Sequence, residues 1–117
     1  MEINIDKSSG YVLIKVLEKQ LDTANSPQLK SEFVLISAGG EKNIVLDIAE
    51  CVSCDSSGLS AMLTANRLCR NAGGNFVIAG MQPNVLKLIQ ISQLDTVLNI
   101  TQSVEEASEL ISKMKNN

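Results

Sequence analysis

Two neighbouring stretches, Ile44-Val45-Leu46-Asp47-Ile48 and Cys51-Val52-Ser53-Cys54-Asp55-Ser56-Ser57-Gly58-Leu59, decide the fold of this chain. The first is almost entirely apolar, which indicates a strand buried on both faces. Residues 58–72 follow the second stretch with apolar residues at helical spacing. The polar residues 55–57 therefore stand between a buried strand and a helix N-terminus, where unpaired N–H groups favour negative charge.

The remaining segments alternate between strand and helix patterns. Residues 1–7 and 11–17 alternate in polarity around a Ser/Gly turn at 8–10, which predicts an antiparallel hairpin. Residues 20–25 are expected to form a polar loop. Two further strands are expected at 76–79 and 97–100.

Helix boundaries are marked by residues with known capping preferences. Ser26-Pro27 predicts a helix start with the Ser26 hydroxyl as cap, and Pro83 predicts another start. Ser103 and Glu106 form a capping box for the last helix. The order is β-β-α-β-α-β-α-β-α: an α/β fold with one domain over residues 1–117, a mixed, mostly parallel sheet opened by a hairpin, and about four helices.

Composition excludes several classes of function. The 117 residues carry a net charge of −3 and only 3% are aromatic, which argues against direct nucleic-acid binding. No apolar run approaches the roughly 20 residues of a membrane span, and the amino terminus lacks a signal-peptide pattern, so we expect a cytoplasmic protein. Three cysteines and no histidine indicate free thiols, without a Ser-His-Asp site, a zinc site or a cofactor.

The sequence Asp55-Ser56-Ser57-Gly58 has a structural and a functional interpretation. Structurally, a hydroxyl, most simply that of Ser57, caps the helix while Gly58 allows close packing. Functionally, Ser56 is a reversible phosphorylation site, with Ser57 as the alternative acceptor. A phosphate adds about −1.5 to −2 charges at pH 7. Beside Asp55 and Asp22, this charge would expel a bound protein without unfolding the chain, because like charges at an interface cost several kcal/mol.

Leu59 and Leu63 fall outside the main apolar arc of the same helix. They either tuck under a neighbouring loop or form an exposed apolar strip beside Ser56, which would suit a binding surface.

The sequence Asp55-Ser56-Ser57-Gly58-Leu59, the upstream Leu21-Asp22 and the order of elements resemble a STAS domain over nearly the whole chain. The similarity is greatest to the bacterial anti-sigma factor antagonists, also called anti-anti-sigma factors. Two departures are Lys19-Gln20, where members often have Gly-Glu, and the cysteines at 51 and 54, where bulky apolar residues are usual.

The resemblance implies a non-enzymatic partner switch. An anti-sigma factor with a GHKL-type serine kinase fold would bind the unphosphorylated protein and so free a sigma factor. The same kinase would phosphorylate Ser56 with ATP, and a PP2C-type phosphatase would reverse this. The partner surface would include Asp22, near the acceptor, together with Asp55, Ser56, Ser57, Gly58, Leu59 and Leu63.

Three alternatives remain open. A STAS protein can instead be a scaffold or accessory subunit of a stress-signalling or transport complex. The Cys51-x-x-Cys54 pair resembles a thiol oxidoreductase motif, although its first cysteine precedes the helix by several residues. Asp47 occupies the place of a receiver-domain phosphoacceptor, but the acidic pair and the lysine that hold magnesium there are missing.

Overall fold

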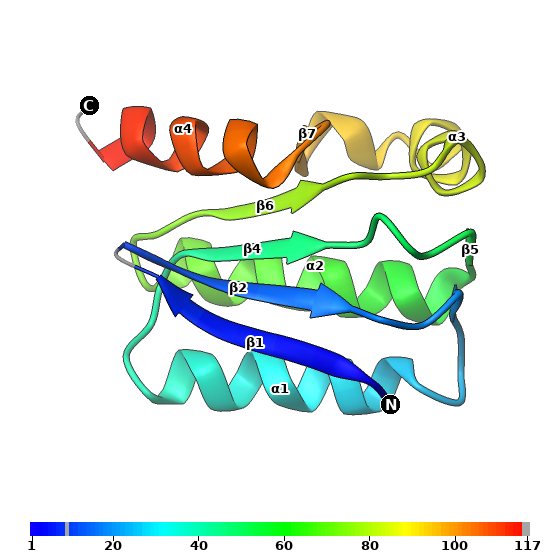
Figure 1. The fold of residues 1–117 in the computed structure, drawn as a ribbon, viewed down its shortest axis with the longest axis horizontal. Helices are drawn as coiled ribbons and strands as arrows, with labels where there is room; N and C mark the ends of the chain where they lie inside the picture. The colour runs from blue at the N-terminus through cyan, green and yellow to red at the C-terminus, as the bar shows by residue number, and fades with distance from the viewer. Residues whose placement is uncertain (9, 116–117) are drawn as a thin grey trace.

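The computed structural model describes residues 1–8 and 10–115, with the backbone alone at Lys115. Ser9, in the expected turn, and residues 116–117 lie outside the described part. The helices and strands, shown in Figure 1, are β1 (Ile3–Ser8), β2 (Tyr11–Val16), β3 (Gln20–Leu21), α1 (Ser26–Ala38), β4 (Ile44–Asp47), β5 (Ser53–Cys54), α2 (Ser56–Asn71), β6 (Phe76–Ala79), α3 (Pro83–Ile91), the 3-10 helix η1 (Leu94–Thr96), β7 (Asn99–Thr101) and α4 (Val104–Lys115).

Five strands form the main sheet in the order β1-β2-β4-β6-β7. β1 pairs with β2 antiparallel, and every other neighbouring pair is parallel. Leu46 in the central strand β4 lies opposite Ile14 on one side and Ile78 on the other. The expected α/β fold, with a hairpin opening a mostly parallel sheet, is confirmed.

Alternate residues of the strands face two separate apolar layers. Ile14, Leu46 and Ile78 belong to the larger layer, which includes buried residues of α1, α2 and α3. Val45 and Val77 belong to the smaller layer, which they share with Ala107 and Ile111 of α4. The central strands are therefore covered on both faces, as their continuous apolar sequence predicted.

A second, two-stranded sheet was not expected. β3 and β5 pair in parallel, with Gln20 opposite Ser53 and Leu21 opposite Cys54. The prediction of a plain polar loop at 20–25 was wrong for these first two residues. This short pairing brings the segment after β2 against the segment that precedes α2 (Figure 1).

The helix caps agree only partly with the sequence. Ser26 does not cap α1 through its hydroxyl: it is the first helical residue and is buried, and Asn25 precedes it. At α4 the Ser103 Oγ accepts a hydrogen bond from the Glu106 N–H at 3.1 Å, while the Glu106 carboxylate accepts one from the Gln102 N–H. Among the residues described, no helix combines the length and apolar content of a membrane span.

Candidate functional site

The N-terminus of α2 is capped by Asp55. Its Oδ1 accepts hydrogen bonds from the Ser57 N–H at 2.9 Å and the Gly58 N–H at 3.3 Å. The Ser57 hydroxyl donates a short third bond to the same oxygen. Asp55, and not Ser57, is therefore the cap, which corrects the sequence-based prediction. The Ser57 hydroxyl is also the largest cause that holds the pKa of Asp55 below its ordinary value, with the backbone N–H groups adding to it.

The two neighbouring serines differ in what their hydroxyls contact. Ser56 is the first residue of α2 and is exposed, and within the described residues its side chain makes no hydrogen bond. Ser57 is half-buried: its hydroxyl is bonded to Asp55 and lies 3.4 Å from the Oγ of Ser26, which is buried. The Ser56 oxygen is thus the one that an incoming molecule reaches without breaking a bond.

Asp22 and Asp55 lie on the same small cleft. The β3–β5 pairing continues into a bond from the Asp55 N–H to the Leu21 carbonyl at 3.0 Å. The cleft, of about 290 Å³, is lined by the residues on either side of this pairing: Gln20, Leu21, Asp22, Ser53, Cys54 and Asp55. Asp22 turns its own loop, since its Oδ1 accepts a hydrogen bond from the Ala24 N–H at 2.9 Å. Two carboxylates, one of them on the residue that precedes Ser56, therefore line the same cleft.

Gly58 allows the start of α2 to lie against the β3–β5 sheet. A Cβ at this position would lie 2.4 Å from the Cys54 Sγ and 3.0 Å from the Leu21 Cβ. The Cys54 Sγ is itself held, because it donates a hydrogen bond to the Asp55 carbonyl at 3.3 Å. The loop cysteine therefore fills the space that Gly58 leaves, and a larger residue at either position forces a shift.

Of the two interpretations of Leu59 and Leu63, the exposed apolar strip is not present. Leu59 is only 8% exposed and belongs to the main core, while Leu63 is half-buried and packs against that core. The interpretation that kept them packed away is correct for Leu59, because the start of α2 contacts β5 as well as α1. Leu63 still borders a shallow surface hollow on α2.

An apolar surface beside the serines comes instead from α1. A groove of about 550 Å³ runs between α1 and α2, and Val34 and Leu35 line it with 48% and 66% of their surface exposed. Ser57 and Ser60 form its other wall. Sequence reasoning passed over Val34 and Leu35. The available signal was that both are apolar yet lie outside the apolar stripe that Leu29, Phe33 and Ile36 form at helical spacing.

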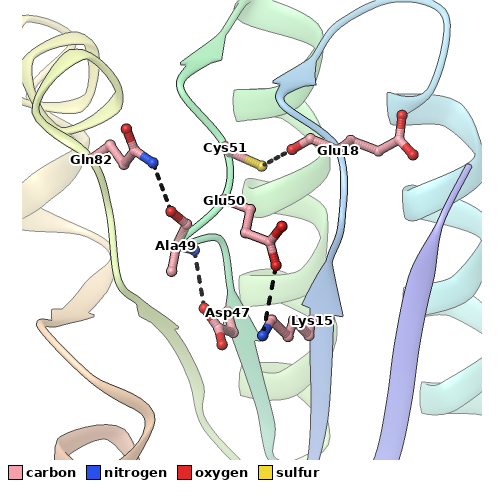
Figure 2. A network of polar contacts seen from close by, with 7 residues as sticks. All are labelled: Lys15, Glu18, Asp47, Ala49, Glu50, Cys51 and Gln82. Carbon is pink, nitrogen blue, oxygen red and sulfur yellow. Dashed lines mark hydrogen bonds and ion pairs between the residues drawn. The ribbon is translucent and has the colours of Figure 1, made fainter.

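The β4–β5 loop is held by a set of polar contacts at the carboxyl edge of the sheet (Figure 2). Asp47 Oδ1 accepts a hydrogen bond from the Ala49 N–H, and the Gln82 side chain donates to the Ala49 carbonyl at 2.7 Å. Lys15 and Glu50 form an ion pair at 3.7 Å. Asp47 thus shapes a turn, which gives it a structural role where the receiver-domain alternative needed a phosphoacceptor.

The cysteines lie in surroundings that disfavour thiolates. Burial is the largest cause in each case, raising the pKa of Cys51 to about 12 and those of Cys54 and Cys69 to about 11. Cys51 donates its thiol hydrogen to the Glu18 carbonyl at 3.1 Å (Figure 2). Reactive redox cysteines have lowered pKa values, so these shifts argue against the oxidoreductase alternative.

Across the described residues, no group of three or more His, Cys, Asp or Glu side chains is arranged to hold a metal ion.

Comparison with known proteins finds several anti-sigma factor antagonists among those with a similar sequence or fold. BtrV of Bordetella bronchiseptica, a candidate anti-sigma factor antagonist, is 29% identical over 108 residues, which is 92% of each chain. An anti-sigma factor antagonist from Mycobacterium paratuberculosis has a similar fold, with a TM-score of 0.85 at 15% identity over 95% of this chain and 93% of that one.

The anti-sigma factor antagonist SpoIIAA of Bacillus also has this fold. Its unphosphorylated form superposes with a TM-score of 0.77 at 20% identity, covering 96% of this chain and 97% of SpoIIAA. A phosphorylated form of SpoIIAA also superposes, with a TM-score of 0.72 at 20% identity over 94% of this chain and 99% of SpoIIAA. The family model of the STAS domain matches residues 2–107 of this chain. The chain therefore belongs to the STAS domain family.

Proposed function

We propose that this protein is an anti-sigma factor antagonist of the cytoplasm that is switched by reversible phosphorylation of Ser56. Unphosphorylated, it binds an anti-sigma factor with a GHKL-type serine kinase fold, and the sigma factor held by that kinase is released. One observation carries the proposal: the Ser56 hydroxyl is exposed and without a hydrogen bond among the described residues, at the first position of α2. The similarity of this chain to BtrV and to the anti-sigma factor antagonist SpoIIAA supports it.

The geometry favours transfer to Ser56 over Ser57. The Ser56 Oγ would attack the γ-phosphorus of ATP, ADP would leave, and the hydroxyl proton would pass to a base of the kinase. A PP2C-type phosphatase would hydrolyse the phosphoserine: water would attack the phosphorus, inorganic phosphate would leave, and the Ser56 hydroxyl would be restored. The same attack by Ser57 first requires its hydroxyl to leave the Asp55 carboxylate. Phosphorylation at 56 therefore disturbs the helix cap less.

The phosphate would release the partner by charge. It would add a second anion beside Asp55 and face the cleft that Asp22 also lines. A docked kinase would bury these like charges together, at a cost of several kcal/mol, and each 1.4 kcal/mol is a tenfold change in affinity. The fold itself needs no rearrangement, because Ser56 is exposed.

The partner surface has two parts in this proposal. The cleft of Asp22 and Asp55 presents two carboxylates to the docked kinase, so added negative charge beside it disfavours binding. The groove of Val34 and Leu35 receives apolar side chains, and its Ser57 and Ser60 wall adjoins the phosphorylation site. Ser56 is the sequence neighbour of Asp55 in the cleft and of Ser57 in the groove, so one modification affects both.

Capture of the partner from native lysate tests this function. Wild type and Ser56→Ala are expected to retain a GHKL-type kinase, and Ser56→Asp is expected to lose it. The recovered kinase with ATP should add one acid-stable phosphate to wild type and to the matched variant Ser112→Ala, whose serine is exposed on α4, but none to Ser56→Ala. Equal capture by all the variants would contradict the switch and indicate a scaffold, the remaining alternative within the family.

A further inference from the structure

Lys30 holds a defined position across the groove from the phosphorylation site. It lies on α1, and its Nζ donates a hydrogen bond to the Ser60 Oγ of α2 at 3.1 Å. Its side chain is half-buried, and it is the one charged residue among those that line the α1–α2 groove. The ion pairs of the described residues join Lys7 to Glu41 and Lys15 to Glu50, so the Lys30 ammonium is held by a neutral hydroxyl.

Ser60 follows Ser56 by one helical turn. Side chains four residues apart on a helix have Cβ atoms about 5–6 Å apart. A phosphate extends further from Ser56 than the hydroxyl does, and a lysine carries its charge on a flexible four-carbon stem. The ammonium of Lys30 can therefore move from the Ser60 hydroxyl to a phosphate on Ser56 without any change in the backbone.

The start of α2 offers a phosphate few free donors of its own. The N–H groups of Ser57 and Gly58 bond to the Asp55 carboxylate, and the Leu59 N–H bonds to the Asp55 carbonyl. The cap is thus already occupied by an anion. A dianion added at Ser56 meets the charge of Asp55, and Lys30 is the cation placed to offset it.

We propose that Lys30 is the internal counter-ion of phosphorylated Ser56, exchanging its hydrogen bond with Ser60 for a charge-assisted bond to the phosphate. This inference rests on the proposed function, since it concerns the modified state of the same serine. Its consequence is that phosphorylation changes the surface twice. The phosphate adds negative charge at the mouth of the groove, and it withdraws the positive charge that the groove offers to a partner.

The pairing has a measurable effect on the phosphate itself. The second ionisation of phosphoserine has a pKa near 6, so a nearby ammonium favours the dianion over the monoanion. Exposed or half-exposed ion pairs are weak, and their usual strength corresponds to a pKa decrease of roughly 0.2–0.7 pH unit. A shift of this size is readily resolved by phosphorus NMR.

The experiment is a phosphorus NMR titration at low ionic strength of the full chain with phosphoserine installed at position 56 during translation. No kinase is required, so failure of the capture experiment above leaves this test intact. Lys30→Met is expected to raise the phosphoserine pKa by the stated amount, while Lys30→Arg keeps the lower value. The control Lys113→Met removes the same charge from an exposed position on α4 and should leave the pKa unchanged.

Two results would overturn the proposal. An identical phosphoserine pKa in wild type and Lys30→Met would show that Lys30 does not contact the phosphate. An equal increase in Lys30→Met and Lys113→Met would show a general effect of net charge. Neither result would bear on whether a kinase phosphorylates Ser56, so the two proposals fail separately.

Discussion

The Ser57 hydroxyl donates a short hydrogen bond to the Asp55 carboxylate that also caps α2 through the Ser57 N–H. This one carboxylate therefore fixes the backbone of the helix start and occupies one of the two adjacent hydroxyls. The Ser56 hydroxyl beside it remains exposed. The two adjacent serines differ because the Asp55 carboxylate accepts a hydrogen bond from the Ser57 hydroxyl and not from the Ser56 hydroxyl.

Asp55→Ala should lower the thermal unfolding midpoint by several degrees, because the N–H groups of Ser57 and Gly58 lose their acceptor. Asp55→Asn should cost less, since asparagine is a comparable N-cap residue. Differential scanning calorimetry of the two variants beside wild type measures the difference. Equal midpoints for wild type and Asp55→Ala would show that the cap contributes nothing to stability.

The charge of Asp55 should make this stabilisation depend on pH. Its pKa is lowered from the ordinary 3.8, chiefly by the Ser57 hydroxyl. A folded-state pKa below the unfolded one gives stability that is present above the unfolded pKa and is lost as pH falls through the folded value. The stability advantage of wild type over Asp55→Asn should therefore be constant near neutral pH and shrink below about pH 4. Urea unfolding at a series of pH values checks this, and an advantage that grows on acidification would refute it.

The sequence was sufficient where its patterns were long enough to show a period. The hairpin, the buried strand β4 and the start of α2 all follow from alternation, apolar runs and polar caps. The sequence did not predict the β3–β5 sheet, because a strand of two residues is too short to show an alternating pattern. The sequence left the burial of Leu59 open because a helical wheel assumes one buried stripe, whereas α2 contacts β5 in addition to α1. The sequence did not predict the apolar groove for a related reason, because the exposure of Val34 and Leu35 depends on how α1 and α2 pack.

Gly58→Ala should destabilise the protein by up to about 2 kcal/mol, because overpacking costs about 1–3 kcal/mol and the gain in helix propensity offsets about 1. The new methyl group would lie 2.4 Å from the Cys54 Sγ. Cys54→Ala removes that sulfur, so the double variant should recover part of the loss and the two effects should not add. Chemical unfolding of the four proteins gives the coupling energy. Strictly additive effects would show that the Cys54 Sγ does not clash with the methyl group of Gly58→Ala.

The three thiols should react slowly with alkylating agents in the folded protein. A pKa of about 11 leaves about one Cys54 thiol in a thousand ionised at pH 8, against about one in ten at the ordinary value of 9.0. We expect Cys54, which is half-exposed, to react first, and the buried Cys51 and Cys69 only through local opening. Mass spectrometry of iodoacetamide labelling, with urea-unfolded protein as the control, measures the rates. Rapid labelling of Cys51 at neutral pH would revive the oxidoreductase alternative.

The groove between α1 and α2 should prove part of the partner surface. Leu35→Ser removes an apolar side chain that is 66% exposed, so the fold should be almost unaffected. If the anti-sigma kinase buries this side chain, its affinity for the unphosphorylated protein should fall about tenfold or more, as for other central interface residues. Ile91→Ser is the matched control, because Ile91 is 71% exposed on α3 and does not line the groove. Isothermal titration calorimetry with the captured kinase separates the two variants. An equal loss in both, or none in either, would place the apolar part of the interface elsewhere and leave the Asp22–Asp55 cleft as the sole docking element of the proposal.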